Sequence, residues 1–214
     1  MKKIAIFGAG GFGREVAWLI EEINSSQISW DLIGFFDDDF SHVKNINPEF
    51  FLGGINELNS WPEDLHIVFA IGNPIVKRRI IQQLSSSRLF FPSLIHPNVV
   101  FGKRNVLIGE GSIICAGCII TIDIQIGQHV ILNLGCTLGH DVIIGDYCSF
   151  MPAVNISGEV LLGESVYVGT GAKIINQLEI GSETIIGAGA VVSKSLPPKC
   201  TAVGIPAKPI KFND

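Results

Sequence analysis

Several features that mark common protein classes are missing from this chain of 214 residues. Lysines and arginines form no extended cluster, and the formal net charge is −5, which argues against a nucleic-acid-binding surface. The longest apolar stretch, around residues 113–122, is too short to cross a bilayer. No basic segment followed by an apolar run opens the sequence, so we expect no secretory signal, no membrane partner and a cytoplasmic location. Histidines at HxH or HxxxH spacing are also missing, which disfavours a metal site.

A six-residue repeat dominates the second half of the chain. An apolar anchor recurs at every sixth position without a slip: Ile108, Ile114, Ile120, Ile126, Leu132, Leu138, Ile144, Phe150, Ile156, Leu162, Val168, Ile174, Ile180, Ile186 and Val192. A glycine follows eight of these fifteen anchors, at positions 109, 127, 139, 145, 163, 169, 181 and 187. A period of six fits neither an α-helix nor one face of a flat strand, but it is typical of a solenoid of short strands.

Each six-residue unit can supply one short strand and one corner. The anchor and the small or β-branched residue two positions before it point inward, because side chains alternate along a strand. Three units make a triangular coil of eighteen residues, so the anchors predict about five coils stacked about 4.8 Å apart. Glycine after the anchor suits a corner where a Cβ would crowd the backbone or where φ must be positive.

The five cysteines fit this repeat better than they fit a disulfide framework or a metal site. Cys118, Cys136 and Cys148 fall on the small inward position, which indicates core packing. Cys115 and Cys118 form a CxxC, but their places in the repeat aim the two side chains in different directions. We therefore expect reduced thiols in a cytoplasmic protein.

The first half of the chain has no such repeat and predicts an α/β domain over residues 1–95. Strands are expected at residues 3–7, 32–36 and 67–71, with an amphipathic helix from Arg14 to about Ile23. The third strand leads into a basic helix that carries Lys77, Arg78 and Arg79. Alternating strands and helices imply a small parallel sheet with ligands at the carboxyl ends of its strands.

A GxGxxG loop follows the first predicted strand, and acidic residues end the second. The loop brings backbone N–H groups and a helix N-terminus to one point, which suits a phosphate. The combination usually indicates NAD, but a dinucleotide site needs two such halves and the chain has room for about one. A mononucleotide, such as that of a nucleotide-sugar, fits better. The alternative is a tight turn whose glycines serve only helix–strand packing.

Further stretches resemble one branch of the hexapeptide-repeat acyltransferases. GAGGFG, FDDD, AIGN at 70–73, LIHP at 94–97, LGHDVIIGD at 138–146 and GIPAKPIK at 204–211 follow one another in that family's order and cover nearly the whole chain. The branch contains the bacterial sialic-acid O-acetyltransferases and UDP-4-amino-sugar N-acetyltransferases. The resemblance implies an α/β half-Rossmann domain followed by an all-β left-handed parallel β-helix over residues 96–214, with a C-terminal cap, in a homotrimer.

Acetyl transfer needs a base that takes a proton from the acceptor, and histidine suits this role. Only His140 lies inside the repeat beside both a carboxylate and a corner glycine. By resemblance it aligns with the family's catalytic histidine, and Asp141 with the carboxylate that orients the ring. That pairing requires the corner to bend the chain, because adjacent strand residues point to opposite faces. Gly158, one coil further, matches the family's main-chain amide that faces the thioester oxygen.

The same resemblance implies two binding sites. The acetyl-CoA groove would be lined by Asn133, Gly158, Thr170, Ala188 and Lys208. The nucleotide-sugar would meet the glycine loop, the acidic end of the second strand and the turn after the third: Gly8, Gly10, Gly11, Phe12, Gly13, Asp37, Asp38, Gly72 and Asn73. Phe12 and Ser149 stand where relatives that act on UDP-4-amino sugars often carry histidine, which leaves the identity of the acceptor open.

The sequence therefore predicts an enzyme that transfers acetyl from acetyl-CoA, without a metal, to the amino group of a nucleotide-linked sugar in surface-glycan synthesis. O-acetylation of sialic acid or of another small hydroxyl acceptor is one alternative. A trimer that binds nucleotide-sugars without catalysis is a second. Of the remaining histidines, we expect His96 to be structural and His129 to be solvated.

Overall fold

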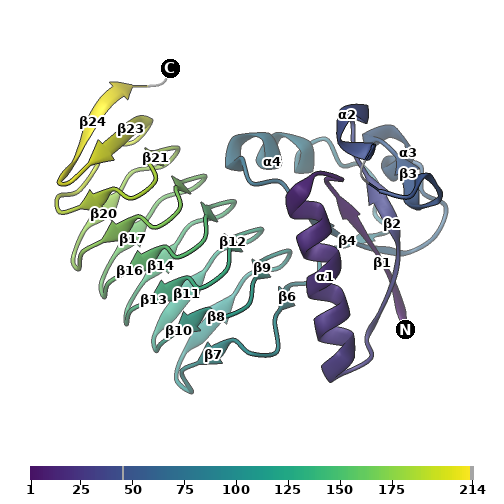
Figure 1. Ribbon diagram of the computed structural model, residues 1–214, viewed down its shortest axis with the longest axis horizontal. Coiled ribbons are helices and arrows are strands. Elements are labelled where there is room, and N and C mark those ends of the chain that lie inside the picture. Colours follow the sequence, from purple (N-terminus) through teal and green to yellow (C-terminus); the bar gives the residue numbers. More distant parts are fainter. Residues whose placement is uncertain (45, 213–214) are drawn as a thin grey trace.

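The computed structural model describes residues 1–44 and 46–212 and consists of an α/β domain and a stack of short strands (Figure 1). The α/β domain contains β1 (Lys2–Phe7), α1 (Gly11–Ser26), β2 (Trp30–Phe36), α2 (Phe40–Val43), the 3-10 turn η1 (Pro48–Phe50), β3 (Phe51–Gly53), α3 (Ile55–Asn59), β4 (Leu65–Phe69), α4 (Pro74–Ile81) and β5 (Leu89–Phe90).

The strands of this domain form a parallel sheet in the order β3-β2-β1-β4-β5. The order reverses between β1 and β4, and ligands of open α/β sheets bind in the crevice at such a reversal. The predicted strands are present with shifted bounds. The third ends at Phe69 rather than at residue 71, so Ala70 to Asn73 form the loop into α4. Helix α1 starts three residues earlier than predicted because the glycine loop forms its first turn.

The second part winds its short strands into three parallel faces, consistent with the predicted left-handed β-helix. Face 1 holds β6 (Leu94–Ile95), β9 (Ile113–Ile114), β12 (Ile131–Leu132), β15 (Ser149–Phe150), β18 (Tyr167–Val168), β21 (Ile185–Ile186) and β23 (Cys200–Gly204). Face 2 holds β7 (Val100–Phe101), β10 (Ile119–Ile120), β13 (Thr137–Leu138), β16 (Asn155–Ile156), β19 (Lys173–Ile174) and β22 (Val191–Val192). Face 3 holds β8 (Val106–Ile108), β11 (Ile124–Ile126), β14 (Ile143–Ile144), β17 (Leu161–Leu162) and β20 (Glu179–Ile180).

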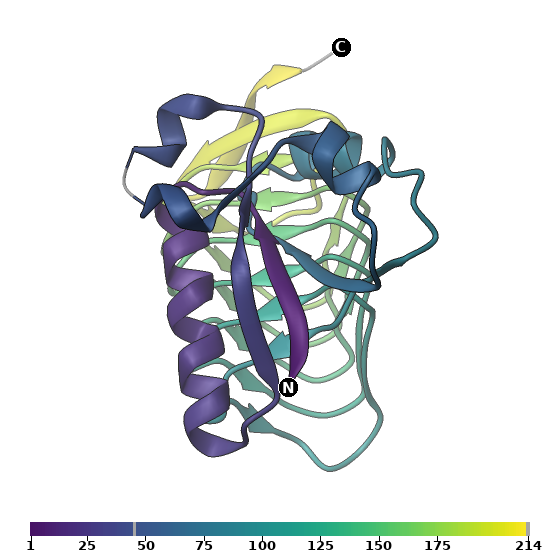
Figure 2. The ribbon, with the colours of Figure 1, turned by 90° about the vertical axis from the view of Figure 1, so that its right-hand side faces the viewer.

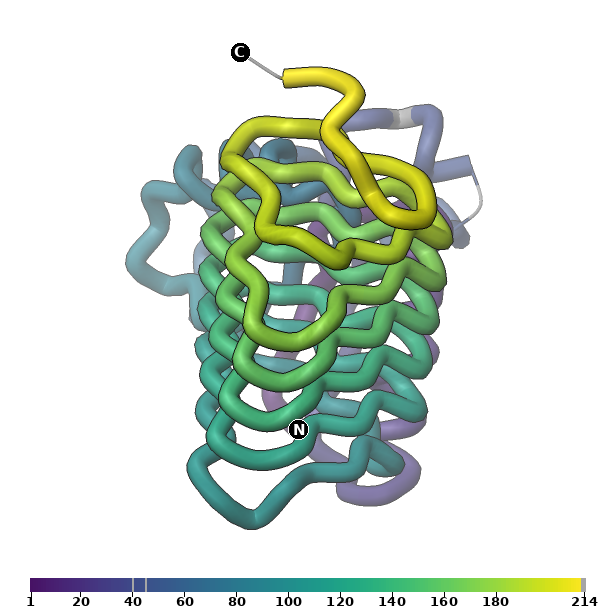
Figure 3. Tube along the Cα trace, turned by 90° about the vertical axis from the view of Figure 1, so that its left-hand side faces the viewer, coloured from purple at the N-terminus to yellow at the C-terminus, as the bar shows by residue number. Residues whose placement is uncertain are grey.

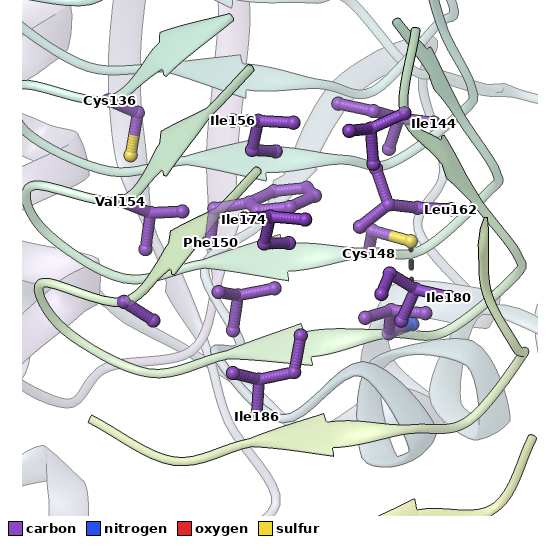
Figure 4. Close-up of a cluster of buried hydrophobic side chains, with 14 of the residues drawn as sticks. Cys136, Ile144, Cys148, Phe150, Val154, Ile156, Leu162, Ile174, Ile180 and Ile186 are labelled. Atoms are coloured by element: carbon purple, nitrogen blue, oxygen red, sulfur yellow. Dashed lines mark hydrogen bonds between the residues drawn. The ribbon is translucent and has the colours of Figure 1, made fainter. Parts of the chain in front are cut away.

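Pairing between neighbouring coils joins residues eighteen positions apart, as the repeat predicts. Leu138 pairs with Ile120 on one side and with Ile156 on the other. The anchors and the small residues two positions before them fill the interior of the coils (Figure 4). Cys118, Cys136 and Cys148 are part of this core, and Cys115 instead packs with residues of the α/β domain. The prediction that the first three serve core packing is confirmed, and the CxxC pair does point in two directions.

The geometry of the corners shows whether glycine follows an anchor because a Cβ would crowd the backbone or because φ must be positive. A Cβ on Gly145 would lie 2.7 Å from the carbonyl carbon of Gly163 in the next coil, and φ of Gly145 is not positive. Positive φ occurs two residues further along, at positions such as Asp123, Asp141 and Glu159. Crowding between coils therefore requires the glycine, and a different residue makes the left-handed bend.

The α/β domain packs against the outer surface of face 1. Helix α1 lies between its own sheet and the coils, and its Leu19 and Ile20 share a core with Ile113 and Ile131 (Figures 1 and 2). Helix α4 reaches over the later coils, where Arg78 forms ion pairs with Glu164 at 3.0 Å and Glu183 at 2.8 Å. The first strand that pairs with the coils is β6, which joins β9. The division of the chain into two domains at residue 95 stays a prediction.

The far end of the stack is covered by a hairpin. β23 pairs with β21 in parallel and with β24 (Ala207–Phe212) in antiparallel fashion, and the two strands lie across the last coils (Figure 3). Ala202 and Ala207 of this hairpin are buried in the β-helix core. The hairpin thus shields apolar side chains that no further coil would cover.

Candidate active site

His140 and Asp141 sit at the corner between faces 2 and 3, directly after β13. The His140 Nδ1 atom lies 2.8 Å from Asp141 Oδ2, and both side chains are more than half exposed. Asp141 has a φ of +58°, which supplies the bend that the pairing requires. A carboxylate oxygen can only accept, so Nδ1 carries the hydrogen and the neutral ring presents a free lone pair on Nε2. That lone pair faces solvent and is available to a proton donor.

Gly158 lies against the imidazole ring from the next coil. A Cβ at this position would approach His140 Cε1 and Nε2 to 2.5 Å, so any larger residue would displace the ring. Within the described residues the Gly158 amide N–H has no intramolecular acceptor. A free backbone donor beside a histidine nitrogen is an arrangement that can hold a developing oxyanion.

Apart from Gly158, the residues predicted to line the acetyl-CoA groove lie away from His140. Thr170 and Ala188 are exposed one above the other at the corner between faces 1 and 2, and Lys208 is exposed on β24. Asn133 is largely buried and its side chain accepts a hydrogen bond from Leu134 N at 2.7 Å. Face 2 separates this corner from His140, so one chain alone does not bring the two groups together.

A cavity of about 730 Å³ opens at the carboxyl ends of β1, β2 and β4, where the sheet order reverses. Of the nine residues predicted to bind a nucleotide-sugar, seven line it: Gly8, Gly10, Gly11, Phe12, Asp37, Asp38 and Gly72. Gly13 lies beneath the loop and Asn73 caps α4, with its side chain accepting from Ile75 N and Val76 N. The structure thus gathers most of the predicted set in one cavity.

The glycines of the loop serve two different purposes. A Cβ on Gly13 would lie 1.8 Å from Gly8 O, and Gly8 itself has a φ of +114°, so both are required by packing and backbone conformation. A Cβ on Gly10 or Gly11 would have no neighbouring atom within 4 Å, so these two glycines face open space. Helix α1 has neither a side-chain cap nor an acidic residue in its first turn. Its amide groups at this end are therefore free to bind an anion.

The acidic residues after β2 are partly occupied by the protein itself. Asp37 accepts hydrogen bonds from Ala9 N at 2.8 Å and Asp39 N at 2.9 Å, so its carboxylate ties the glycine loop to β2. His42 Nδ1 adds a third contact to Asp37, at 3.0 Å. Asp38 uses one oxygen to accept from Ile55 N at 2.8 Å, and among the described residues its other oxygen accepts no hydrogen bond. Asp37 thus acts first as a positioning residue.

Helix α4 contributes a wall to this cavity that the sequence did not lead us to expect. Val76, Arg79 and Ile80 of α4 line it together with Gln83 of the turn that follows the helix, and Arg79 has no ion-pair partner among the described residues. The spacing of three and four residues places the three helix residues on one face, which is the signal that could have identified them. Arg79 supplies positive charge to a cavity that otherwise carries the carboxylates of residues 37–39.

His129 was expected to be solvated, and this prediction is wrong. The ring is only 3% exposed, stacks on Tyr147 and meets Phe69 and Phe91 edge-on. Burial, with the nearby Lys77 ammonium, lowers the pKa of His129 to about 4. The residue is therefore neutral at physiological pH and enclosed at the domain junction. His96 is buried beside Trp18, as a structural residue should be.

Lys77 of α4 is completely buried at the same junction. Its Nζ atom donates to Ser149 Oγ at 3.0 Å and to Cys148 O at 3.4 Å, and no carboxylate neutralises it within the described part of the chain. Burial lowers the pKa of Lys77 to about 7. Over the described residues there is no cluster of three or more potential metal ligands, and no helix there is long and apolar enough to span a bilayer.

Comparisons with known proteins agree with this geometry. Residues 3–84 match the family described as the PglD N-terminal domain. UDP-N-acetylbacillosamine N-acetyltransferase of Bacillus subtilis (strain 168) is 37% identical over 119 residues, and that match covers 54% of this chain and about half (52%) of the relative.

Solved structures match over nearly the full length. The acetyltransferase domain of PglB from Neisseria gonorrhoeae FA1090, in complex with acetyl coenzyme A, is 31% identical with a TM-score of 0.86, covering 98% of this chain and 99% of that one. WeeI from Acinetobacter baumannii AYE has the same identity and TM-score and is covered completely, with 98% of this chain aligned. The chain belongs to the PglD type of hexapeptide-repeat nucleotide-sugar N-acetyltransferases.

A further member of this set was solved with both of its ligands. PerB from Caulobacter crescentus, in complex with CoA and GDP-perosamine, is 28% identical with a TM-score of 0.83, over 99% of this chain and 98% of that chain. Two structures of the GDP-perosamine N-acetyltransferase of Caulobacter crescentus, in which one histidine is replaced by asparagine or alanine, match with TM-scores of 0.84 and 0.83. The family therefore includes enzymes that bind a coenzyme A and a nucleotide-linked amino sugar together.

Proposed function

We propose that this protein transfers an acetyl group from acetyl-CoA to the amino group of a nucleotide-linked amino sugar. The observation that carries the proposal is the position of His140 in a chain of this family: Asp141 contacts its Nδ1, and Gly158 lies against the Nε2 side of its ring. The nucleotide cavity at the ends of β1, β2 and β4 supplies the second binding site that such a transfer needs.

The reaction can be written with these groups alone. His140 Nε2 takes a proton from the acceptor amine while the amine nitrogen attacks the thioester carbonyl carbon. The Gly158 N–H donates to the oxyanion of the tetrahedral intermediate. The carbonyl re-forms as the C–S bond breaks, and the proton on His140 passes to the leaving thiolate of coenzyme A. Asp141 stabilises the imidazolium that exists between these two transfers and keeps its ring in place. The acetyl group passes directly, without an acyl-enzyme intermediate.

Acetyl-CoA is a co-substrate in this scheme, held along the corner that carries Thr170 and Ala188, with Lys208 near its phosphates. The nucleotide phosphates would meet the open side of Gly10 and Gly11 and the amino end of α1. No step requires a metal ion. All five cysteines are free thiols, which fits a reducing compartment such as the cytoplasm.

The scheme also calls for a homotrimer. His140 lies at the corner between faces 2 and 3, and the nucleotide cavity lies on the side of face 1, so a neighbouring chain has to supply the histidine. The outward side chains of Ile143 and Leu161, which are neighbours on face 3, leave an exposed apolar patch next to that corner, and Gln125 separates it from the exposed Leu107. Such a patch is suited to contact with a partner chain.

The test is a pair of histidine substitutions in the purified protein. We expect His140→Asn to lower kcat by about 10²–10⁴-fold while the Kd of acetyl-CoA is unchanged, because only the base is lost. His66→Asn is the matched control, since His66 does not line the nucleotide cavity, and it should retain turnover. Full activity of His140→Asn would remove His140 from the mechanism. An ester product rather than an amide would assign the chain to O-acetylation instead.

A further inference from the structure

A column of polar residues runs along the corner between faces 2 and 3, where His140 lies. On this corner a residue with positive φ recurs every eighteen positions, and in five successive coils it is a carboxylate or an amide: Asn105, Asp123, Asp141, Glu159 and Gln177. Backbone hydrogen bonds join the coils here, for example from Glu159 N to His140 O at 2.8 Å. Since the coils stack about 4.8 Å apart, three acidic residues lie one above another, with an amide residue at each end.

The first and the third carboxylate of this column are engaged by donors other than the histidine. The two oxygens of Asp123 accept from Arg104 Nε at 3.2 Å and 3.0 Å, and Asn105 Nδ2 adds a third hydrogen bond at 2.9 Å. Glu159 accepts from Gln177 Nε2 at 3.1 Å. Only the middle carboxylate accepts from the histidine, and no other side chain in the described part of the chain donates to it.

Arg104 is the only cation among the described residues, the histidine aside, that forms an ion pair with this column. Its hydrogen bonds to Asp123, together with that of Asn105, hold the pKa of the Asp123 carboxyl below its ordinary value, so this group is negative at neutral pH. The contact with Asp123, and more weakly the charge of Asp141, raises the pKa of the Arg104 guanidinium. Arg104 therefore interacts with the middle carboxylate as well as with its direct partner.

This arrangement bears on the charge of the His140 ring. Negative groups nearby favour the protonated imidazole ring, and positive groups disfavour it. The residues eighteen positions before and after His140, Ile122 and Gly158, carry no charge. The charged side chains along the corner are one guanidinium and three carboxylates: Arg104, Asp123, Asp141 and Glu159. Because Arg104 is paired with Asp123, one of the three negative charges near the histidine is cancelled.

We propose that Arg104 is a positioning residue for the catalytic histidine. Through its pairing with Asp123 it cancels one negative charge beside His140, and it thereby sets the pH above which that ring is a free base. The inference rests on the proposed function, in which His140 takes a proton from the acceptor amine. Arg104 acts through Asp123 and is not itself a catalytic residue. The electrostatic link is a property of the protein without substrates and can be measured separately.

The test is a charge cycle on the pair of Arg104 and Asp123, read by the pH dependence of kcat/KM at low ionic strength. The acid limb of that profile reports the protonation of the base in the free enzyme. Arg104→Gln leaves a negative charge unpaired, so the acid limb should move up by about 0.3 pH unit, the effect of one unit charge about 10 Å away in a water-like dielectric. Asp123→Asn leaves a positive charge unpaired, so the limb should move down by a similar amount.

Further variants separate the charge from the shape of the side chains. The double variant Arg104→Gln/Asp123→Asn has lost both charges and should return to the wild-type profile, and Arg104→Lys, which keeps its charge, should do the same. High salt should remove most of both shifts, because the Arg104 side chain is exposed to solvent. Lys3→Gln and Glu63→Gln are the matched controls. They break an exposed ion pair of 2.6 Å on the α/β domain and should leave the limb in place.

An NMR titration of His140 measures the same link without substrates. With ¹³C-labelled histidine, and the signal assigned through His140→Asn, the free protein should show the same two opposite shifts. Shifts of one sign, or no shift in either single variant, would overturn the role of Arg104. If wild type acetylates no nucleotide-linked amino sugar, the proposed function fails and the part of Arg104 in catalysis fails with it. If wild type is active and the acid limb stays in place in every variant, only the role of Arg104 is wrong.

Discussion

The contact between Gly158 and the His140 ring allows the position of the base to be changed without touching the base itself. In a Gly158→Ala variant the new Cβ would lie 2.5 Å from both Cε1 and Nε2 of His140. Carbon atoms in contact are ordinarily about 3.5 Å apart, so the ring has to move by about 1 Å. The backbone at residue 158 has no positive φ, and the histidine side chain is more than half exposed, so the ring can yield while the coils stay in place.

The size of the effect follows from this displacement. A shift of about 1 Å in a reacting group can cost about 10²-fold in rate, because the base no longer meets the amine as it attacks. We therefore predict that Gly158→Ala lowers kcat about 10²-fold, and that the free energy of unfolding changes by no more than about 0.5 kcal/mol. Initial rates of coenzyme A thiol release would give kcat, and a urea melt would give the stability.

A double-mutant cycle separates the ring from the amide. If Gly158→Ala acts through the ring, it should cost nothing further in a His140→Ala background, where no ring remains to be displaced. An undiminished kcat in the single variant would show that the ring position is unimportant. A further loss of about 10²-fold in the double variant would show that residue 158 acts independently of His140, for instance through its amide alone.

Three other predictions concern the nucleotide cavity and the domain junction. Gly10→Val should fold, because its side chain enters open space, and it should weaken nucleotide-sugar binding without affecting the binding of acetyl-CoA. Gly13→Ala should instead unfold the α/β domain, because its Cβ would lie 1.8 Å from Gly8 O. Calorimetry would measure binding and circular dichroism would measure folding, and two equally folded variants would contradict the prediction. Arg79→Gln should raise the Kd of the nucleotide-sugar about tenfold, and Arg79→Lys should recover part of the lost affinity. Lys2→Gln, at the opposite end of β1, is the control and should not change this Kd. An unchanged Kd in Arg79→Gln would exclude Arg79 from the site. The folded pKa of Lys77, about 7, lies below its usual value of 10.5, so the unfolded chain binds more protons between these values and stability should rise as pH increases from about 7 to 9. Lys77→Met should flatten that rise in urea melts, and an identical slope in the variant would refute the assignment.

The β-helix could be predicted from the sequence because the period of the repeat determines which strands pair between neighbouring coils. Residues that pair between coils are eighteen positions apart, so the spacing of anchors such as Ile120 and Leu138 specifies both the strand and its neighbour. The bend at Asp141 could be anticipated as a condition for its pairing with His140, and the structure has it. The repeat could not show whether a corner glycine is required because a Cβ would collide with the next coil or because φ must be positive. That distinction depends on the positions of atoms in the next coil.

The features that sequence reasoning missed depend on contacts between distant segments. His129 looks solvated within its repeat, but Phe69 and Phe91 of the α/β domain enclose it. The sequence position of Asp37 indicates a ligand-binding carboxylate, but in the structure this carboxylate accepts a hydrogen bond from the Ala9 amide. Arg79 becomes visible as a cavity residue only once α4 is placed over the glycine loop. In each case the decisive partner is remote in sequence, and only for Arg79 does a local pattern, the helical spacing of α4, point toward the site.

The most direct test of the central claim is a transfer assay with purified protein, acetyl-CoA and a panel of UDP- and GDP-linked amino sugars, read by thiol release and by the mass of the product. We predict that one nucleotide-linked amino sugar is converted to its acetamide with release of one thiol per product, and that His140→Asn abolishes nearly all of this turnover while still binding acetyl-CoA. Binding of a nucleotide-sugar with no thiol release from acetyl-CoA would contradict this claim and would leave a nucleotide-sugar-binding protein in place of an enzyme.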